Sequence, residues 1–488
     1  MTSHFVLPAP FADHSVATGL FIGGRWLAGK ARAEVVNPGN GKKLTDVADG
    51  DEGEATAAVD AAAAAAPAWA ATAPRRRAEI LRDCYGRMVA GADWLAFLIA
   101  LENGKTLADA RAEILYAADF FRWYSEEAVR RLGEITVAPG GQNRIMVEYQ
   151  PIGVSLLITP WNFPAAMATR KIAPALAAGC SVILKPALET PLTAFAIADI
   201  MAEAGVPPGV MNVITTSKPG LFAKKILHDP RVRKLSFTGS TSVGRALLKE
   251  AADQVISSSM ELGGNAPFIV FADADLNDAL DGAMLAKMRG GGQACTAANR
   301  FYVERSVYKA FTDGLVARMA SLKLGEGTDP ETMLGPMINA KAVAKIAELV
   351  DDAVAKGATL LLGGTRLNRV GTYYPATVIS DVPGNARLLR EEIFGPVAAL
   401  QAFDSDAEVI AKANDSEYGL TAYLYTGDMK RGLRISEKLE AGMIGLNRGL
   451  VSDPAAPFGG VKQSGLGREG SHHGLMEFTE CKYIATNW

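Results

Sequence analysis

The chain has 488 residues, of which 49% are hydrophobic and 21% are charged, and its formal net charge at pH 7 is −3. This length predicts two or three domains with an ample buried core. No basic run stands out, so a nucleic-acid-binding protein is not expected. No stretch approaches about 18 uninterrupted apolar residues, so no membrane span is expected either.

The N-terminus and the cysteines indicate the compartment. The first residues, MTSHFVLPAPFADHS, lack the basic start and apolar run of a secretion signal. The cysteines, Cys84, Cys180, Cys295 and Cys481, lie far apart and form no CxxC pair. This spacing argues against a metal site and against a disulfide scaffold. We therefore expect a protein of the reducing cytoplasm without a bound metal.

The N-terminal quarter contains a long helical pattern. The tract Asp60–Ala71 is rich in alanine, which is a good helix former, and the pattern continues to about Tyr124. A loop-rich segment is predicted at Gly133–Asn143. It leads into a predicted strand at Arg144–Tyr149, where polar and apolar residues alternate.

Strands and helices then alternate along the chain. Because the predicted strands are continuously apolar, they indicate parallel βαβ units buried on both faces. The predicted strands are Val154–Ile158, Ser181–Lys185, Met211–Ile214 and Lys234–Gly239, and the predicted helices are Ala165–Ala178, Leu192–Ala204 and Ser242–Ala252.

A second series of the same kind follows. It begins with the apolar run Ala266–Phe271, continues with a helix at Asp275–Arg289 and extends past Tyr425. We place the change of domain near Glu261–Gly264. The predicted fold class is therefore α/β, in an arrangement typical of nucleotide-binding proteins, although fold alone does not define function.

Two residues with reactive side chains, Cys295 and Glu261, lie at the ends of predicted helices or strands. Cys295 lies in RGGGQACTAANR, near the end of a predicted helix, where a stabilised thiolate can act as a nucleophile. Glu261 lies in SSSMELGGN, where a partly buried carboxylate with a raised pKa can act as a general base. Taken singly, an inert buried cysteine and a solvated or capping glutamate are the commoner outcomes.

Two loops at strand ends complete the set. Asn162 lies in TPWNFP, and a rigid loop between prolines can hold a side-chain amide toward an oxyanion, although an asparagine in a simple turn is common. The loop Phe237–Gly244, FTGSTSVG, precedes a helix whose N-terminus can bind a pyrophosphate. It is not the GxGxxG fingerprint, so by itself it is a weak signal.

Together these motifs resemble the aldehyde dehydrogenase superfamily. The matching segments are TPWNFP, KPA, FTGSTSVG, MELGGN, GQxC, EEIFGP and PFGGVKQSGLGREG, and the resemblance runs from FIGGRW to the last strand. It implies two Rossmann-type α/β domains and a small β oligomerisation element. The implied division is a cofactor domain at 1–127 and 152–260, a catalytic domain at 261–463 and an oligomerisation element at 128–151 and 464–488.

The resemblance also implies a mechanism. Cys295 attacks the aldehyde carbon, and the Asn162 side chain and the Cys295 backbone N–H hold the resulting oxyanion. After hydride transfer, Glu261 activates the water that hydrolyses the thioester. Lys171 matches a lysine near the active site, and Glu469 matches a carboxylate that relays protons.

A nicotinamide cofactor, NAD or NADP, is implied by further matches. Glu392 corresponds to the residue that binds the nicotinamide ribose, with Phe394 beside it, and Lys185 to the lysine that reaches the adenosine ribose. The remaining implied cofactor residues are Thr159, Pro160, Trp161, Leu188, Gly239, Ser240 and Leu262.

One position departs from the pattern of NAD-preferring relatives. These often carry a glutamate three residues after the ribose lysine, where Leu188 stands in this chain. A missing carboxylate removes a hydrogen-bond acceptor for the ribose diol and a repulsion against a 2′-phosphate. The missing carboxylate favours NADP, or use of both cofactors. The adjacent Glu189 is the alternative group that could bind the ribose diol.

The resemblance is strongest to the succinate-semialdehyde dehydrogenase branch. In that branch, the residues matching Arg170, Arg289 and Ser452 bind the distal carboxylate of the substrate, which suits guanidinium and hydroxyl donors. A structural ion pair is the alternative for each arginine. The branch often has a second, redox-active cysteine where this chain has Ala297, so no such switch is expected.

Several alternatives remain open at this point. Glutarate semialdehyde or another ω-carboxylate aldehyde differs only in the pocket length it needs. A CoA-acylating relative would need no carboxylate base, whereas Glu261 is present. A non-enzymatic structural homologue or binding scaffold would not need intact Cys295, Glu261 and Asn162. We also expect pairing across a dimer, because the apolar C-terminal strand near Tyr483–Thr486 and the segment Ser125–Tyr149 would otherwise leave a bare edge. The resemblance further implies a homodimer or a homotetramer.

Overall fold

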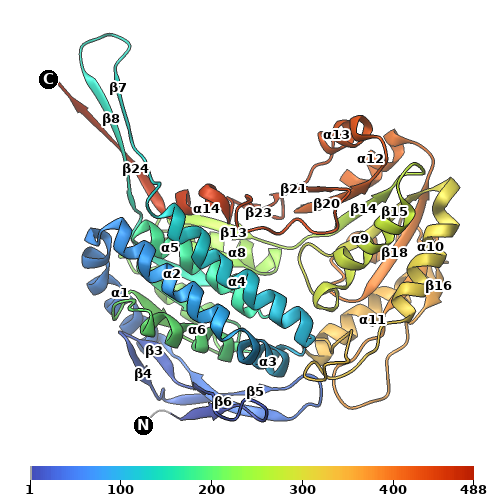
Figure 1. Cartoon of the computed structure of the whole chain (residues 1–488), viewed down its shortest axis with the longest axis horizontal. Coiled ribbons are helices and arrows are strands. Elements are labelled where there is room, and N and C mark those ends of the chain that lie inside the picture. Colours follow the sequence, from blue (N-terminus) through green and yellow to red (C-terminus); the bar gives the residue numbers. More distant parts are fainter. Residues whose placement is uncertain (1–2, 488) are drawn as a thin grey trace.

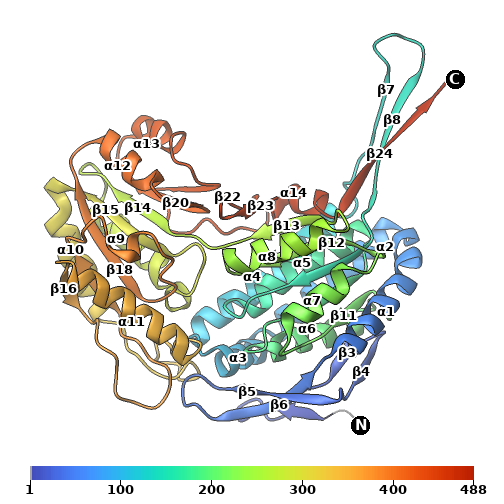
Figure 2. The same ribbon diagram turned by 180° about the vertical axis from the view of Figure 1, so that it is seen from behind.

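Two large β-sheets, each covered by helices, form the two halves of the computed structural model, which describes residues 3–487 (Figure 1 and Figure 2). A narrow arm of three strands projects from the first half, beside α14 (Ser471–Met476). The predicted α/β fold class is confirmed.

The first sheet has eight strands, and its central strands are parallel. The central strands are mostly buried, because helices cover both faces. In order across the sheet, the strands are β23 (Gly465–Leu466), β13 (Ser257–Glu261), β12 (Val232–Thr238), β9 (Val154–Ile158), β10 (Val182–Lys185), β11 (Met211–Val213), β3 (Leu20–Ile22) and β4 (Arg25–Leu27).

Different helices cover the two faces of this sheet. On one face, α5 and α6 pack on the strands, and α2, α3 and α4 pack on these two helices. On the opposite face, α1, α7 and α8 enclose a second apolar core. The helices are α1 (Glu52–Ala71), α2 (Pro74–Ala90), α3 (Ala92–Asn103), α4 (Leu107–Glu127), α5 (Pro164–Ala178), α6 (Pro191–Glu203), α7 (Pro219–Leu227) and α8 (Thr241–Ala252).

The second sheet has seven strands, all parallel except for the edge strand β16. Its strands in order are β16 (Thr359–Leu362), β17 (Thr377–Ser380), β18 (Val397–Phe403), β15 (Ala298–Glu304), β14 (Ala266–Val270), β20 (Thr421–Tyr425) and β21 (Met443–Leu446). The covering helices are α9 (Leu276–Met288), η1 (Arg289–Gly292), α10 (Arg305–Ala320), α11 (Ala340–Ala355), η2 (Arg387–Leu389), α12 (Asp406–Asn414) and α13 (Met429–Ser436).

Smaller sheets complete the fold. The projecting arm consists of β24 (Thr479–Thr486), β8 (Arg144–Pro151) and β7 (Glu134–Val137), all antiparallel. The remaining pairs are β1 (His4–Val6) with β2 (Ser15–Ala17), β5 (Ala31–Val36) with β6 (Lys43–Asp49), and β19 (Tyr418–Gly419) with β22 (Val461–Lys462).

Several predicted elements need correction. The loop predicted at Gly133–Asn143 was wrong in part, because β7 occupies Glu134–Val137 and pairs with β8. The single helical pattern that ends near Tyr124 is in fact four helices, because breaks follow Ala71, Ala90 and Asn103. The strands before residue 50 and helix α7 were not predicted at all.

The predicted domain boundaries stay predictions, but the sheets show which segments associate. Within the predicted C-terminal oligomerisation segment, Gly465–Leu466 forms the edge strand of the first sheet by pairing with β13, whereas Thr479–Thr486 belongs to the arm. Among residues 3–487, no single helix is long and apolar enough to cross a membrane; α2 and α3 meet that test only as a pair bent by 73°.

Candidate active site

A cavity of about 690 Å³ opens between the two large sheets. Its walls come from loops that follow β9, β12 and β13 of the first sheet, and from the segment after η1, α11 and the loop before β18 of the second. Nine predicted site residues line it: Pro160, Trp161, Asn162, Gly239, Ser240, Leu262, Cys295, Glu392 and Phe394.

Three consecutive glycines carry the chain from α9 to Cys295. Gly290, Gly291 and Gly292 have φ values of +61°, +66° and +75°, in the left-handed region that only glycine adopts readily. A Cβ on Gly292 would lie 2.3 Å from the carbonyl oxygen of Gly395. The glycine run is therefore a steric requirement of the turn that brings Cys295 to the cavity.

Asn162 faces the same cavity from the loop between β9 and α5. Its Nδ2 donates to the carbonyl oxygen of Gln293 at 2.9 Å, and its buried Oδ1 has no partner among the described residues. An amide nitrogen carries two hydrogens, so one hydrogen of Asn162 stays available to a ligand at the cavity. The nucleophile loop itself thus orients the amide.

Glu261 is the last residue of β13 and is 3% exposed. In the described part of the chain, neither of its carboxylate oxygens has a hydrogen-bond partner. Burial raises the pKa of Glu261 well above its usual value, and the negative charge of Glu469 adds to the shift. A carboxylate whose pKa is raised accepts a proton more readily than a free one, as a general base requires.

A buried cluster of charges lies behind Glu261. The Lys171 ammonium donates to the Glu469 carboxylate and, at 3.0 Å, to the Ser236 hydroxyl. The Arg170 guanidinium is 3.6 Å from the other Glu469 oxygen and donates to the Tyr116 hydroxyl at 2.5 Å. Glu469 therefore already supplies an anion to Arg170, which was predicted to bind substrate.

The Cys295 thiol is protonated in this environment. Burial, together with the nearby charges of Glu261 and Glu392, raises the pKa of Cys295 to about 12. The thiolate is the nucleophilic form, so reaction at neutral pH requires removal of this proton as attack occurs. A carboxylate of raised pKa in the same site is a suitable acceptor.

Other residues that line the same cavity suit a dinucleotide. The Ser240 side chain does not cap α8, so the first turn of this helix offers backbone N–H groups to a pyrophosphate, with Gly239 and Ser240 lining the cavity beside it. Glu392 accepts from the Gly264 N–H at 3.1 Å, and burial raises its pKa to about 7. Phe394 packs edge-on against Trp161, with 5.4 Å between ring centres.

Other predicted cofactor residues lie outside this cavity. Thr159 donates its backbone N–H to the carbonyl oxygen of Lys185 at 3.1 Å, and burial lowers the Lys185 pKa. Leu188 and Glu189 line a second cavity of about 460 Å³. Asn339 lines both cavities, so the two adjoin each other at the start of α11.

Arg289 and Ser452 come from the second half of the molecule. The Arg289 guanidinium lies 5.1 Å from the centre of the Phe163 ring, and among residues 3–487 it forms no ion pair. Ser452 is half-buried in the loop after β21. Neither they nor Arg170 line the 690 Å³ cavity, which contains Cys295.

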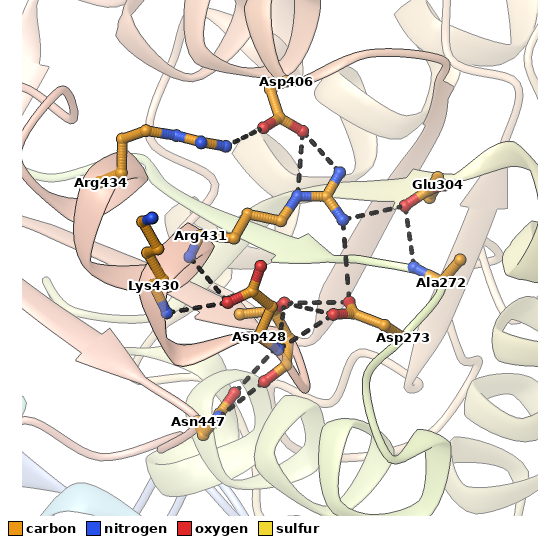
Figure 3. A network of polar contacts seen from close by, with 10 residues as sticks. Ala272, Asp273, Glu304, Asp406, Asp428, Lys430, Arg431, Arg434 and Asn447 are labelled. Atoms are coloured by element: carbon orange, nitrogen blue, oxygen red, sulfur yellow. Dashed lines mark hydrogen bonds and ion pairs between the residues drawn. The ribbon is translucent and has the colours of Figure 1, made fainter.

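A polar network fixes the start of the Ser452 loop (Figure 3). The Asn447 side chain accepts from the Thr426 N–H and donates to the Thr426 carbonyl oxygen, both at 2.9 Å. Asn447 itself has a left-handed φ of +51°. The Thr426 hydroxyl in turn donates to Asp273, which lies 3.8 Å from Arg431 on α13.

One supporting residue was missed in the sequence. Gln293 holds Asn162 through its carbonyl oxygen, and its side-chain oxygen accepts from the Ile338 N–H at 2.9 Å. The signal was present, because Gln293 is the glutamine of the GQxC motif. Its side chain thus connects the nucleophile loop to the segment that precedes α11.

The model of the aldehyde dehydrogenase family matches residues 26–484, nearly the whole chain. The chain belongs to the aldehyde dehydrogenase family.

Curated relatives of this aldehyde dehydrogenase carry two substrate names. A succinate-semialdehyde dehydrogenase of Paenarthrobacter nicotinovorans is 52% identical, over 90% of this chain and 98% of the relative. An NADP(+) succinate-semialdehyde dehydrogenase of Escherichia coli is 49% identical, over 95% and 96%. A glutarate-semialdehyde dehydrogenase of Pseudomonas putida is 47% identical, over 95% and 96%.

Solved structures agree with this membership. A succinate-semialdehyde dehydrogenase from Burkholderia pseudomallei superposes with a TM-score of 0.95 at 46% identity, covering 97% of this chain and 98% of that one. The arrangement of sheets and helices described above is therefore that of the family.

We predict that alkylation of Cys295 by iodoacetamide in the cofactor-free enzyme is slow at pH 7 and accelerates about tenfold per pH unit up to pH 9. The reason is that its pKa of about 12 leaves a thiolate fraction that grows tenfold per unit. Peptide mass spectrometry at several times measures the rate, with Cys295→Ser as control. A rate independent of pH would contradict the raised pKa.

Proposed function

We propose that this aldehyde dehydrogenase oxidises an ω-carboxylate aldehyde, first of all succinate semialdehyde, to the acid with NADP or NAD. The observation that carries the proposal is the meeting of Cys295, Asn162 and the α8 N-terminus in one cavity. The names of the succinate-semialdehyde relatives support the substrate. Glutarate semialdehyde is the second candidate, supported by the name of the third relative.

The chemistry follows from groups of this chain. The Cys295 sulfur adds to the aldehyde carbon as its proton leaves, and the new oxyanion accepts from the free Asn162 amide hydrogen and the Cys295 backbone N–H. A bound nicotinamide supplies the acceptor for the hydride, which leaves a thioester on Cys295. Glu261 then takes a proton from water, the hydroxide adds to the thioester, and the acid leaves as the thiol re-forms.

Lys171 and Glu469 support proton transfer at Glu261. Glu469 contacts two cations, Lys171 and Arg170, which compensate for the burial of its charge. Its negative charge keeps the Glu261 pKa high. We assign the pair to holding Glu261 ready to accept a proton, and to passing the proton onward.

Arg289 and Ser452 are the stronger candidates for the distal carboxylate of the substrate. Arg289 has no ion-pair partner within residues 3–487, and a guanidinium suits bidentate binding of a carboxylate. Arg170 contributes in this proposal through its remaining donors, because one side of it already faces Glu469.

The cofactor preference is assigned to NADP, with NAD as a second substrate. Leu188 leaves no carboxylate at its position to repel a 2′-phosphate, and the buried Lys185 is the nearby cation. The NADP(+) in the name of the Escherichia coli relative supports this choice. Glu189, next in the chain, is exposed and is the group that would favour NAD.

We also propose a homodimer or homotetramer located in the cytoplasm. The arm leaves large apolar side chains uncovered, among them Ile135, which is 66% exposed, and Tyr483, which is 57% exposed. Exposed strand edges with apolar side chains favour association. All four cysteines are free thiols, which agrees with a reducing compartment.

The kinetic test compares succinate semialdehyde, glutarate semialdehyde and butanal, each with NADP and NAD. We expect Arg289→Ala to raise KM for the semialdehyde at least about tenfold more than KM for butanal, because a charged hydrogen bond contributes about 1.5–3 kcal/mol. Arg305→Ala, which removes an exposed arginine paired with Asp404, is the matched control. Equal effects on all aldehydes would make Arg289 structural.

In the same assay, NADP should be used at least as well as NAD by kcat/KM, and Leu188→Glu should shift the ratio toward NAD. The added carboxylate would accept from a ribose diol and repel a 2′-phosphate. A strong NAD preference of the unaltered enzyme would show that Glu189 or another group has taken this role.

The pH dependence of thioester hydrolysis tests Glu261. The base acts deprotonated, so the rate falls as pH drops through its raised pKa. Removing the Glu469 charge lowers that pKa, so Glu469→Gln should move the midpoint to lower pH. Rapid quench and mass spectrometry follow the acyl-enzyme, which should accumulate in Glu261→Gln and be absent in Cys295→Ala. A midpoint that rises in Glu469→Gln would contradict the assignment.

Light scattering at micromolar concentration tests the assembly. We expect a mass of two or four times the 51.5 kDa chain. Ile135→Asp together with Ile484→Asp, which places charges on the exposed arm, should yield monomers. Leu221→Asp, at an exposed position on α7, should not. A monomeric unaltered enzyme would refute the proposed assembly.

A further inference from the structure

Lys105 and Glu113 form a buried ion pair to which the mechanism above assigns no role. The Lys105 ammonium is 2.5 Å from a Glu113 oxygen, and the two side chains are 1% and 0% exposed. Lys105 precedes α4, and Glu113 lies within this helix. Burying two charges is costly unless further hydrogen bonds satisfy them, so the other partners of the pair indicate what it does.

Both members bind the turn that carries Asn162. The Lys105 ammonium donates to the Asn162 carbonyl oxygen at 2.7 Å. The second Glu113 oxygen accepts from the backbone N–H groups of Ala165 at 2.9 Å and Ala166 at 3.2 Å. Helix α5 starts here without a side-chain cap of its own, so Glu113 supplies the cap and its negative charge suits the helix N-terminus.

The same short segment also holds the neighbouring loops. The Asn103 side chain donates to the Trp161 carbonyl oxygen at 2.9 Å. Asp109, in the first turn of α4, accepts from the Gly290 N–H at 2.9 Å. The beginning of α4 therefore connects the Asn162 turn of the first half to the glycine turn that leads to Cys295.

We propose that Lys105 and Glu113 are positioning residues that hold the Asn162 amide in line with the oxyanion formed at Cys295. Lys105 fixes the backbone carbonyl of Asn162, while Gln293 engages one hydrogen of its side chain. Because the backbone carbonyl and the side-chain amide of Asn162 are both held, its second amide hydrogen points in a fixed direction. The proposal rests on the proposed function, because it acts only through the oxyanion.

A double-mutant cycle in kcat tests this coupling, with Lys105→Met, Asn162→Ala and the double variant. Asn162→Ala alone should lower kcat about 10²–10³-fold, as loss of an oxyanion donor does. Lys105→Met alone should lower kcat at least about tenfold, since a displacement near 1 Å can cost as much as about 10²-fold. The double variant should be no slower than Asn162→Ala within about threefold. KM for the aldehyde and Kd for the cofactor should change little.

If the fold-loss in kcat of the double variant equalled the product of the two single-variant losses, the proposal would be overturned. That result would show that Lys105 acts independently of Asn162. If Asn162→Ala left kcat unchanged, the oxyanion assignment of the proposed function would fail, and this proposal with it. The two failures are therefore distinguishable in one data set.

Two further variants separate positioning from stability. Arg77 is a matched buried cation that donates to the Ala177 carbonyl oxygen, at the other end of α5, at 3.1 Å. Arg77→Met should lower Tm while kcat stays within twofold. Glu113→Gln keeps the shape of the cap but removes the charge, and it should reproduce the coupling to Asn162→Ala if Lys105→Met does not fold. An equal loss of kcat in Arg77→Met would overturn the proposal.

Discussion

Keeping the Glu261 carboxylate away from water costs free energy, because a buried charge loses its hydration and finds no hydrogen bond in return. The surrounding groups are arranged in a way that limits this cost. Lys171 and Arg170 supply positive charge, and Glu469 balances them, so the region behind the cavity contains two anions and two cations. Even so, burial and the negative charge of Glu469 raise the pKa of Glu261 well above its usual value. The high pKa of the neighbouring Cys295 has the same main origin, because burial raises it and the negative charges of Glu261 and Glu392 add to the shift.

Local patterns predicted the centre of the fold well. The strand Val154–Ile158 and the helix that ends at Ala178 have the predicted bounds within one residue, because continuous apolar runs and flanking glycine or proline define them. Weaker patterns failed. Strand β7 has four exposed residues and depends on pairing with β8, which a local pattern does not reveal. Within the site, Cys295, Asn162 and Glu392 were predicted from motifs, and all three line the cavity.

The ion pairs of the site could not be predicted from local patterns, because they depend on how separate segments pack together. The contact of Arg170 with Glu469 joins residues 299 positions apart, since 469 − 170 = 299, and no periodicity reports such a pair. Its presence means that the predicted alternative of an ion pair holds for Arg170. Lys105 and Glu113 are near in sequence, yet a lysine and a glutamate in this region predict only a solvated helix face. They are buried because α4 packs against the Asn162 turn.

The clamp between Asn447 and Thr426 has a consequence for how such an enzyme can change during evolution. It fastens the first residue of the Ser452 loop to the sheet, and Phe458 at the far end is fastened by paired backbone hydrogen bonds with Glu469. A loop anchored at both ends can exchange its middle residues without moving the strands that carry the reactive groups. Under the proposed role of Ser452, recognition of the aldehyde tail is separable from the chemistry at Cys295, so substitutions in this loop can change the preferred substrate while the reaction is retained.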